Sequence, residues 1–278
     1  MRFPVYNATR YVQPLREGGS LPAVVDTDDH GLVVVKFRGA GQGARVLVAE
    51  LVVGGLADRL ELPVPSLSLV EVAPRFGRSE PDPEIQELLR KSHGVNVGMR
   101  YLEGAFNFDP TAAGDLITPE LAARIVWLDA FTTNPDRTHR NPNLLIWQRS
   151  PWLIDHGAAL YAHHDWRSVD AERTRSAFQM IRTHVLLAVA GDLGATDAWA
   201  RSRVTEDVIT DVLDAVPDDL LMDAETGARD FADAGEARER YVRYLSGRLQ
   251  AHDVWMGEAA RAQEQRRIEQ PLQLQARR

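Results

Sequence analysis

The stretch DRTHRNPNLLIWQRSPWLIDHG, residues 136–157, decides how the centre of this chain folds. Residues 143–147 and 152–154 are rich in apolar and aromatic side chains, which predicts two short strands. The segment between them, 148–151, has the composition of a tight turn. Two strands joined in this way form an antiparallel hairpin.

Polar residues stand at the ends of this predicted hairpin. Asn141 precedes the first strand and Asp155 follows the second, so both lie at the open end, and Asp136 lies on the loop that leads there. Carboxylate and carboxamide oxygens are hard ligands that suit Mg²⁺ held against phosphates, and a further carboxylate can orient an attacking hydroxyl. The hairpin therefore predicts one site built by Asp136, Asn141 and Asp155.

A helix is expected before the loop. Residues 118–120, Thr-Pro-Glu, combine a hydroxyl cap, a proline in the first turn and a favourable acid. Apolar side chains then recur at helical spacing at Leu121, Ile125 and Leu128. The helix must end near residues 132–133, because Asn-Pro follows at 134–135.

Near the N-terminus the sequence predicts another hairpin, from strands 21–25 and 32–37 around the turn-like segment 26–31. Antiparallel pairing brings Lys36 close to the glycine-rich segment 17–20. A lysine and a glycine-rich bend thus arrive at the same end of one hairpin.

A helix over residues 44–60 follows, and Glu50 lies on its apolar face. A buried carboxylate requires a cationic or hydrogen-bonding partner, and Lys36 is the nearest candidate along the chain. The alternative is a partly buried face from which Glu50 reaches water. The local sequence leaves both interpretations open and favours the second.

Strand patterns, including one at 67–72, dominate the first part of the chain, and helical patterns dominate from residue 119 onward. This asymmetry predicts an α+β protein with two lobes: a sheet-rich N-terminal nucleotide-binding lobe, 1–103, and a helical C-terminal lobe, 104–278, that carries the loop and the hairpin. Residues 98–104 are expected to form a short strand and turn that connect the lobes.

The ordered motifs resemble those of protein kinases. The loop 136–141 matches their D-x-x-x-x-N catalytic loop, and residues 155–157, Asp-His-Gly, stand where these enzymes carry D-F-G. The arginine and histidine inside the loop are similar to the D-R-H-x-x-N loop of phosphoinositide kinases. Overall, the chain most resembles the HipA-like bacterial serine/threonine kinases, and the resemblance implies a bilobal protein-kinase-like fold.

The resemblance implies a nucleotide site in the first lobe. Lys36 would contact the nucleotide phosphates and Glu50 would be its helix partner. The phosphate-covering loop would contain Gly18, Gly19 and Ser20, and the nucleotide contacts would also include Met99 and Tyr101.

In the second lobe, Asp136 would be the catalytic carboxylate, and Asn141 and Asp155 would hold Mg²⁺. The implied activity is a kinase that uses ATP and Mg²⁺ to transfer the γ-phosphoryl group to a hydroxyl acceptor, with protein serine or threonine favoured. The alternatives are a catalytically idle nucleotide-binding module, AMP transfer, and phosphorylation of a small molecule or lipid on the same scaffold.

The sequence departs from the protein-kinase pattern at three places. A full G-x-G-x-x-G is absent, His156 replaces the phenylalanine of D-F-G, and no Ala-Pro-Glu follows Asp155. The residues that cover the nucleotide and any activation-loop regulation therefore do not follow from the resemblance.

The composition limits which classes of protein and which partners remain possible. The chain has 278 residues, 44% hydrophobic and 26% charged, as in ordinary globular proteins. Its net charge of -8 predicts no nucleic-acid partner, and the absence of cysteine excludes disulfides, thiolate zinc sites and a cysteine nucleophile. Without a secretory signal pattern or a membrane-length apolar run, we expect a cytoplasmic protein that does not bind membranes.

Other residues that could suggest a metal or dinucleotide site are expected to have structural roles. His163 and His164 are placed in a polar loop, and residues 39–43, which include three glycines, in a strand-to-helix loop. The tail after Ala259 is expected to be a solvated helix end that frays. Surface or capping positions are expected for His184, His252, Asp218 and Asp219, and core positions for Trp127, Trp147 and Trp152.

Overall fold

The computed structural model describes residues 1–15, 21–41, 43–78, 80–110 and 116–269. Its N-terminal part is a closed barrel with strand order β1-β2-β3-β5-β4. Neighbouring strands pair antiparallel except β1 and β4, which pair parallel and close the barrel. The strands are β1 (Val5–Pro14), β2 (Ala23–Thr27), β3 (Gly31–Lys36), β4 (Leu67–Val72) and β5 (Gly94–Arg100).

The N-terminal hairpin forms largely as the sequence predicts. In β2 and β3, Ala23 lies opposite Val35 and Thr27 lies opposite Gly31. Gly31 has a φ of 73°, which suits glycine in a tight turn. The register places Lys36 at the end of the hairpin where β2 begins.

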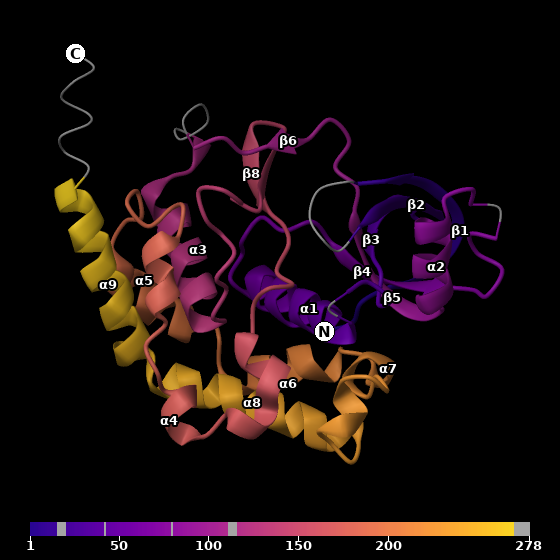
Figure 1. Cartoon of the computed structure of the whole chain (residues 1–278). Helices are drawn as coiled ribbons and strands as arrows, with labels where there is room; N and C mark the ends of the chain where they lie inside the picture. The colour runs from indigo at the N-terminus through magenta and orange to yellow at the C-terminus, as the bar shows by residue number, and fades with distance from the viewer. Residues whose placement is uncertain (16–20, 42, 79, 111–115, 270–278) are drawn as a thin grey trace.

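Helix α1 (Ala44–Arg59) lies between the barrel and the helices of the C-terminal part (Figure 1). It is buried over most of its length, so the main hydrophobic core extends from α1 and the barrel strands into the C-terminal helices. A second hydrophobic core lies inside the barrel and includes the buried side of α2 (Pro83–Lys91), which packs against it.

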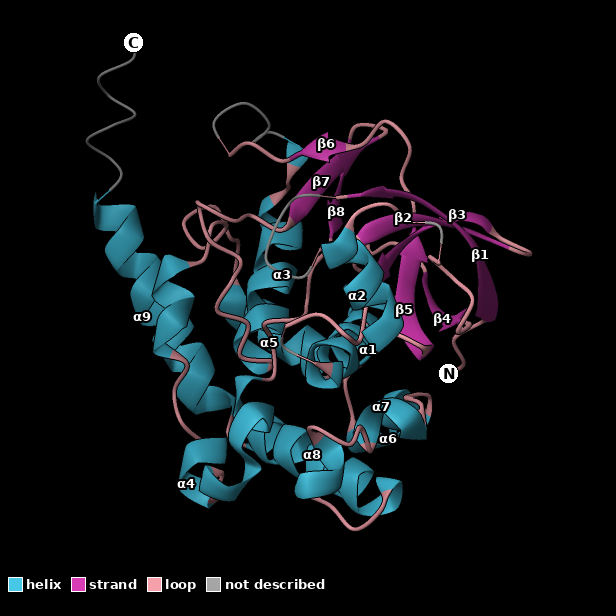
Figure 2. Cartoon of the chain, turned by 45° about the vertical axis from the view of Figure 1, so that its right-hand side comes forward, coloured by secondary structure: helices cyan, strands magenta, loops and turns pink. Residues whose placement is uncertain are grey.

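The C-terminal part is mainly helical, with one small three-stranded sheet (Figure 2). That sheet consists of β6 (Phe106–Asn107), β7 (Leu144–Trp147) and β8 (Ser150–Leu153). The helices are α3 (Pro119–Phe131), α4 (Ala171–Thr174), α5 (Leu193–Arg201), α6 (Glu206–Asp214), α7 (Asp218–Leu221), α8 (Ala234–Gln250) and α9 (His252–Glu269). Short 3-10 segments are η2 (Tyr161–Ser168), η3 (Gln179–Thr183) and η4 (Gly227–Arg229). The α+β class, with strands first and helices after, is confirmed.

Helix α3 begins and ends where its sequence signals indicate. The Thr118 hydroxyl accepts a hydrogen bond from the Leu121 amide, and Thr132 follows the last helical residue. The hairpin of β7 and β8 also forms, with Leu144 opposite Leu153. The loop 136–141 is therefore held between a capped helix and a registered hairpin.

Strand β1, helix α2 and the start of strand β5 differ from the sequence expectations. Neither β1 nor α2 is among the predicted elements, and the pairing of β1 with β4 joins distant parts of the sequence. Helix α2 starts at Pro83, where the Asp82 carboxylate caps it. Strand β5 starts at Gly94 and not near residue 98.

The expectation that the chain frays after Ala259 is wrong as far as residue 269. Helix α9 continues to Glu269, and Gln263 is 7% exposed. Its side-chain amide donates to the Ala190 carbonyl at 2.6 Å. One face of the helix is therefore packed, although the composition is polar. Among the described residues, no helix has both the length and the apolar character required to cross a membrane.

Candidate active site

Lys36, at the end of β3, is the centre of a buried ion cluster. Its Nζ donates to Glu50 Oε1 on α1 and, at 2.5 Å, to Asp155 Oδ1 just after β8. Lys36 is 5% exposed and Glu50 only 1%. The interpretation in which Glu50 reaches water is therefore wrong, and the expected pairing with Lys36 is present. A strand, a helix and a loop that are distant in sequence converge on one ammonium group.

The charges of this cluster are set by opposing effects. Burial alone would lower the pKa of Lys36, but the Glu50 and Asp155 carboxylates outweigh it and raise the pKa above its usual value. Burial would likewise raise the pKa of Asp155, but Lys36 outweighs it and the net shift is downward. Burial raises the pKa of Glu50, although Lys36 opposes the shift. Asp155 is thus the strongly ionised carboxylate of the cluster.

Asp155 is also the accessible carboxylate. Its side chain is 41% exposed, compared with 1% for Glu50. Its φ of 55° lies in the left-handed region, which is unusual for a residue other than glycine. Two residues on, a Cβ at Gly157 would lie 2.5 Å from Val46 Cγ1 and 3.1 Å from Glu50 Oε1. The glycine lets this segment approach α1 closely enough for the ion cluster to form.

Asp136 is held by the amides around it. Its Oδ2 accepts hydrogen bonds from Asn141 Nδ2 at 2.7 Å and from Asn143 Nδ2 at 3.1 Å. Its backbone amide donates to Asn134 Oδ1 at 3.1 Å. Asp136 and Asn141 are therefore brought together, as the sequence predicts for the open end of the hairpin.

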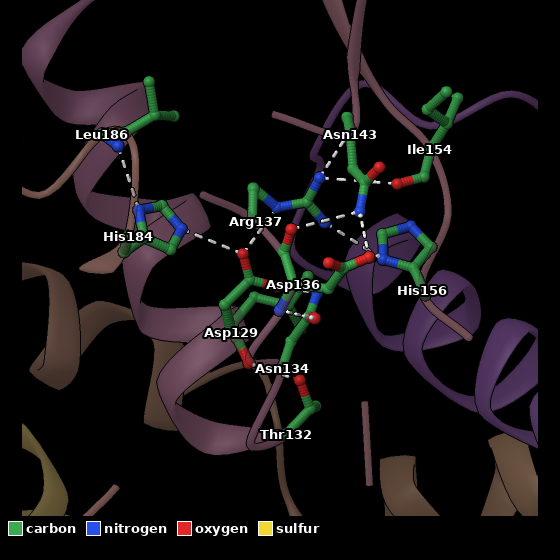
Figure 3. Close-up of polar contacts among 11 residues, drawn as sticks. Asp129, Thr132, Asn134, Asp136, Arg137, Asn143, Ile154, His156, His184 and Leu186 are labelled. Carbon is green, nitrogen blue, oxygen red and sulfur yellow. Dashed lines mark hydrogen bonds and ion pairs between the residues drawn. The ribbon is translucent and has the colours of Figure 1, made fainter. Parts of the chain in front are cut away.

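A second buried cluster joins this loop to the hairpin (Figure 3). Arg137 Nε donates to Asp129 Oδ2 at 2.6 Å, and both side chains are inaccessible to solvent. The other end of the guanidinium donates to the Asn143 carbonyl at 2.5 Å and approaches the Ile154 carbonyl at 3.4 Å. It also lies 3.4 Å from His156 Nδ1. Arg137 directly follows Asp136, and its side chain contacts the residues on both sides of Asp155.

His184 belongs to the same cluster, and the expectation that it lies at a surface or cap is wrong. It is 3% exposed, and its Nε2 lies 3.0 Å from Asp129 Oδ2. The two residues are 55 positions apart, so no local sequence pattern predicts this contact. A charged residue, Asp129, in the apolar run of α3 is the sequence signal that could have predicted a buried polar network here.

His163 is likewise not part of a polar loop. It is fully buried in η2, and its Nδ1 lies 2.9 Å from the Tyr241 hydroxyl, whereas the next residue, His164, is exposed. His252 pairs with Asp197 Oδ2 at 2.8 Å. Asp218 and Asp219 are exposed in the first turn of α7, as expected.

The three tryptophans near the hairpin differ in burial. Trp127 is fully buried, as expected. Trp147 and Trp152 are only half-buried and pack edge to face on the hairpin, with ring centroids 5.5 Å apart. They cover the hairpin surface and do not belong to the core.

Two further nucleotide candidates, Met99 and Tyr101, lie in β5 and directly after it. Met99 lies opposite Val34, two residues before Lys36, so it shares a sheet face with Lys36. Tyr101 directly follows β5, and its amide donates to the Leu32 carbonyl at 3.4 Å. Gly18, Gly19 and Ser20 lie outside the described residues.

The donor set is compatible with Mg²⁺. Asp155 offers an ionised, partly exposed carboxylate, and Asn141 uses its Nδ2 on Asp136, which leaves its amide oxygen for another partner. Within the described ranges, no group of three or more histidine, aspartate or glutamate side chains could hold a metal ion. A site with only two protein oxygens fits Mg²⁺, which commonly completes its shell with water and substrate phosphates.

The fold of the chain resembles that of a known kinase. The solved structure of the proinflammatory kinase CtkA of Helicobacter pylori resembles the chain with a TM-score of 0.52. The alignment covers 95% of this chain and 99% of that chain at 12% identity, which shows a common fold. Among curated protein sequences, none matches the chain.

A family model described as HipA-like kinase matches residues 9–226. The match contains most of the barrel, α1, the loop 136–141 and the β7–β8 hairpin, and it covers more than half of the sequence. The resemblance noted from the motifs is confirmed, and the chain belongs to the HipA-like kinase family.

Proposed function

We propose that this protein is an ATP- and Mg²⁺-dependent kinase that transfers the γ-phosphoryl group to the hydroxyl of a protein serine or threonine. The barrel part, residues 1–103, and the helical part, residues 104–278, act as the two lobes of a kinase-like fold. The observation that carries the proposal is the contact of Lys36 with both Glu50 and Asp155. It joins the β3 lysine, the helix glutamate and the Asp-x-Gly aspartate in one cluster.

Lys36 supplies a fixed positive charge for the nucleotide phosphates. Its protonated state is favoured by two carboxylates, and its position is fixed by Glu50, which is itself buried and cannot turn to solvent. Because Asp155 also contacts Lys36, a bound metal and the phosphates would share this region. Met99, on the same sheet face, would contact the nucleotide along the barrel. Tyr101, Gly18, Gly19 and Ser20 are proposed as further nucleotide contacts.

Asn141 and Asp155 would hold Mg²⁺, which neutralises charge on the transferred phosphoryl group when it is bound. Asp136 is oriented by the two amide donors of Asn141 and Asn143, so one of its oxygens is engaged. Its other oxygen would accept the proton of the acceptor hydroxyl. As the new oxygen–phosphorus bond forms, the bond between the γ-phosphorus and the bridging oxygen breaks, and ADP leaves with that oxygen. Positioning and charge neutralisation supply most of the rate.

The experiment that tests the proposal uses ATP labelled either at the α- or at the γ-phosphate, with Mg²⁺ and protein acceptors. Transfer of the γ-label alone to a protein hydroxyl is the expected result. Transfer of the α-label would indicate AMP transfer. ATP binding without any transfer to protein, lipid or small-molecule acceptors would support an idle nucleotide-binding module and overturn the proposal.

A further inference from the structure

Asp129, in the last turn of α3, is fully buried yet contacts no part of the Lys36 cluster described above. Its Oδ2 accepts from Arg137 Nε at 2.6 Å and lies 3.0 Å from His184 Nε2. Its Oδ1 accepts from Asn134 Nδ2 at 2.9 Å. Two side chains from the loop after α3 and one from the end of η3 therefore share one carboxylate.

The hydrogen bonds of His184 assign its proton. The Leu186 amide donates to Nδ1 at 3.1 Å, so Nδ1 is the acceptor and the ring proton is on Nε2, facing Asp129. His184 also forms an isolated bridge with Thr138 of the catalytic loop. The Asp129 carboxylate thus contacts donors from the loop itself and from His184, which pairs with the loop.

Two routes lead from Asp129 to the reacting groups (Figure 3). Through Arg137, it reaches the Asn143 carbonyl, and also the Ile154 carbonyl and the His156 ring on either side of Asp155. Through Asn134, it reaches the backbone amide of Asp136, which donates to Asn134 Oδ1 at 3.1 Å. One carboxylate is therefore connected to the backbone of Asp136 and to both sequence neighbours of Asp155.

We infer that Asp129 is a positioning residue for phosphoryl transfer, which acts through Arg137 and Asn134 to keep Asp136 in register with Asp155. The inference rests on the proposed function. An aspartate in this position is suited to the task because a charged, fully desolvated pair is costly to separate. An arginine fork is suited because its planar donors fix direction as well as distance.

The chain offers a matched control for a merely structural role. Asp197, on α5, is also buried; it accepts from Trp127 Nε1 and Arg201 Nε and lies 2.8 Å from His252 Nδ1. None of these partners belongs to the catalytic loop or the hairpin. Asp197→Asn should therefore lower stability without changing kcat of the folded fraction.

The first measurement compares kcat and the KM for ATP in Asp129→Asn and Asp197→Asn at a temperature where both are folded. Asparagine at 129 presents an amide to Arg137 in place of one carboxylate oxygen. The expected result is a fall in kcat of about tenfold to a hundredfold, a scale known for misplaced catalytic groups. The KM for ATP should change less than about threefold, because Lys36 also holds Asp155 directly. An unchanged kcat in Asp129→Asn would overturn the inference.

A second variant keeps the test valid if Asp129→Asn fails to fold. The main hazard of the single substitution is that the buried charge of Arg137 loses its partner. In Asp129→Asn/Arg137→Met that charge is removed as well. The hydrogen bonds to Asn143, Ile154 and His156 are still lost, so kcat should remain low although the fold is recovered. Full recovery of kcat would show that the cluster contributes stability alone.

A double-mutant cycle then tests the route to Asp136. If Asp129 and Arg137 act by placing that carboxylate, the double variant should cost much less in kcat when Asp136→Asn is already present. Additive losses would overturn the inference. These outcomes differ from failure of the proposed function, which would appear as an absence of γ-phosphoryl transfer by the unaltered protein.

Discussion

Two buried ion clusters lie near the proposed reaction centre. They differ in solvent accessibility and in how far apart their members lie in the sequence. The open cluster consists of Lys36, Glu50 and Asp155, and the closed cluster consists of Asp129, Arg137 and His184. Asp155 in the open cluster is 41% exposed, whereas Asp129 and Arg137 have no exposed side-chain surface. The Lys36–Asp155 contact spans 119 residues of sequence, and the Arg137–Asp129 contact spans eight.

The difference suggests a division of tasks. A buried ammonium beside a partly exposed, ionised carboxylate can still exchange partners with a charged ligand. A charge pair without solvent access cannot do so and can only hold other groups in place. We therefore expect substitutions in the open cluster to change ligand binding and those in the closed cluster to change geometry and stability.

The largest expected effect is in the open cluster, at Asp155. Asp155→Ala removes the accessible carboxylate, so Mg²⁺-dependent ATP binding should fall below detection in calorimetry. The circular dichroism spectrum should stay unchanged, because the side chain is not part of a hydrophobic core. An unaltered affinity for Mg-ATP would show that the open cluster does not bind the metal.

Asp136 provides a sharper separation of binding from turnover. Asp136→Asn keeps the shape of the side chain but removes its charge and most of its ability to accept a proton. We expect a loss in kcat of about 10²-fold or more, with ATP affinity nearly normal. Phosphoryl transfer at the unaltered rate would mean that another residue orients the acceptor.

The close approach of Gly157 to α1 gives a third test of the open cluster. In Gly157→Ala the new methyl group would meet Val46 and Glu50, so unfolding in urea should show a loss of about 1–3 kcal/mol. Gly41→Ala is the control, since a Cβ there would have none of the described residues within 4 Å, and its effect should stay within about 0.5 kcal/mol. Equal stability losses in the two variants would contradict the packing argument.

The smallest effect concerns the pH dependence of the closed cluster. Burial, as the largest cause, lowers the pKa of His184, while Asp129 opposes the shift. Below the unfolded pKa of about 6.5, the unfolded chain therefore binds a proton that the folded chain does not. Stability should fall as the pH decreases from there, by at most about 1.4 kcal/mol per pH unit from this residue.

His184→Gln removes this titration and keeps a donor for Asp129. Its unfolding free energy, measured in urea between pH 7 and pH 5, should fall less steeply than that of the unaltered protein. Identical slopes would place the pKa of His184 near its ordinary value in the folded state.

Local patterns in the sequence were sufficient for much of the site. The cap of α3, the proline after it and the two short strands determine the loop and hairpin, because each depends on residues only a few positions apart. The meeting of Asp136 with Asn141 follows from that hairpin. Lys36 at the end of β3 and Glu50 on the apolar face of α1 follow from strand and helix periodicity in the same way.

The tertiary structure decided the contacts that join these local pieces. Closure of the barrel by β1 and β4, the pairing of Lys36 with Asp155 and the burial of His184 against Asp129 all link distant segments. The packed face of α9 belongs to the same group. Periodicity indicates which face of an element is apolar, but it does not say which other element will cover that face. Whether a charged residue such as Glu50 or Asp129 meets water or a partner therefore depends on how the whole chain packs.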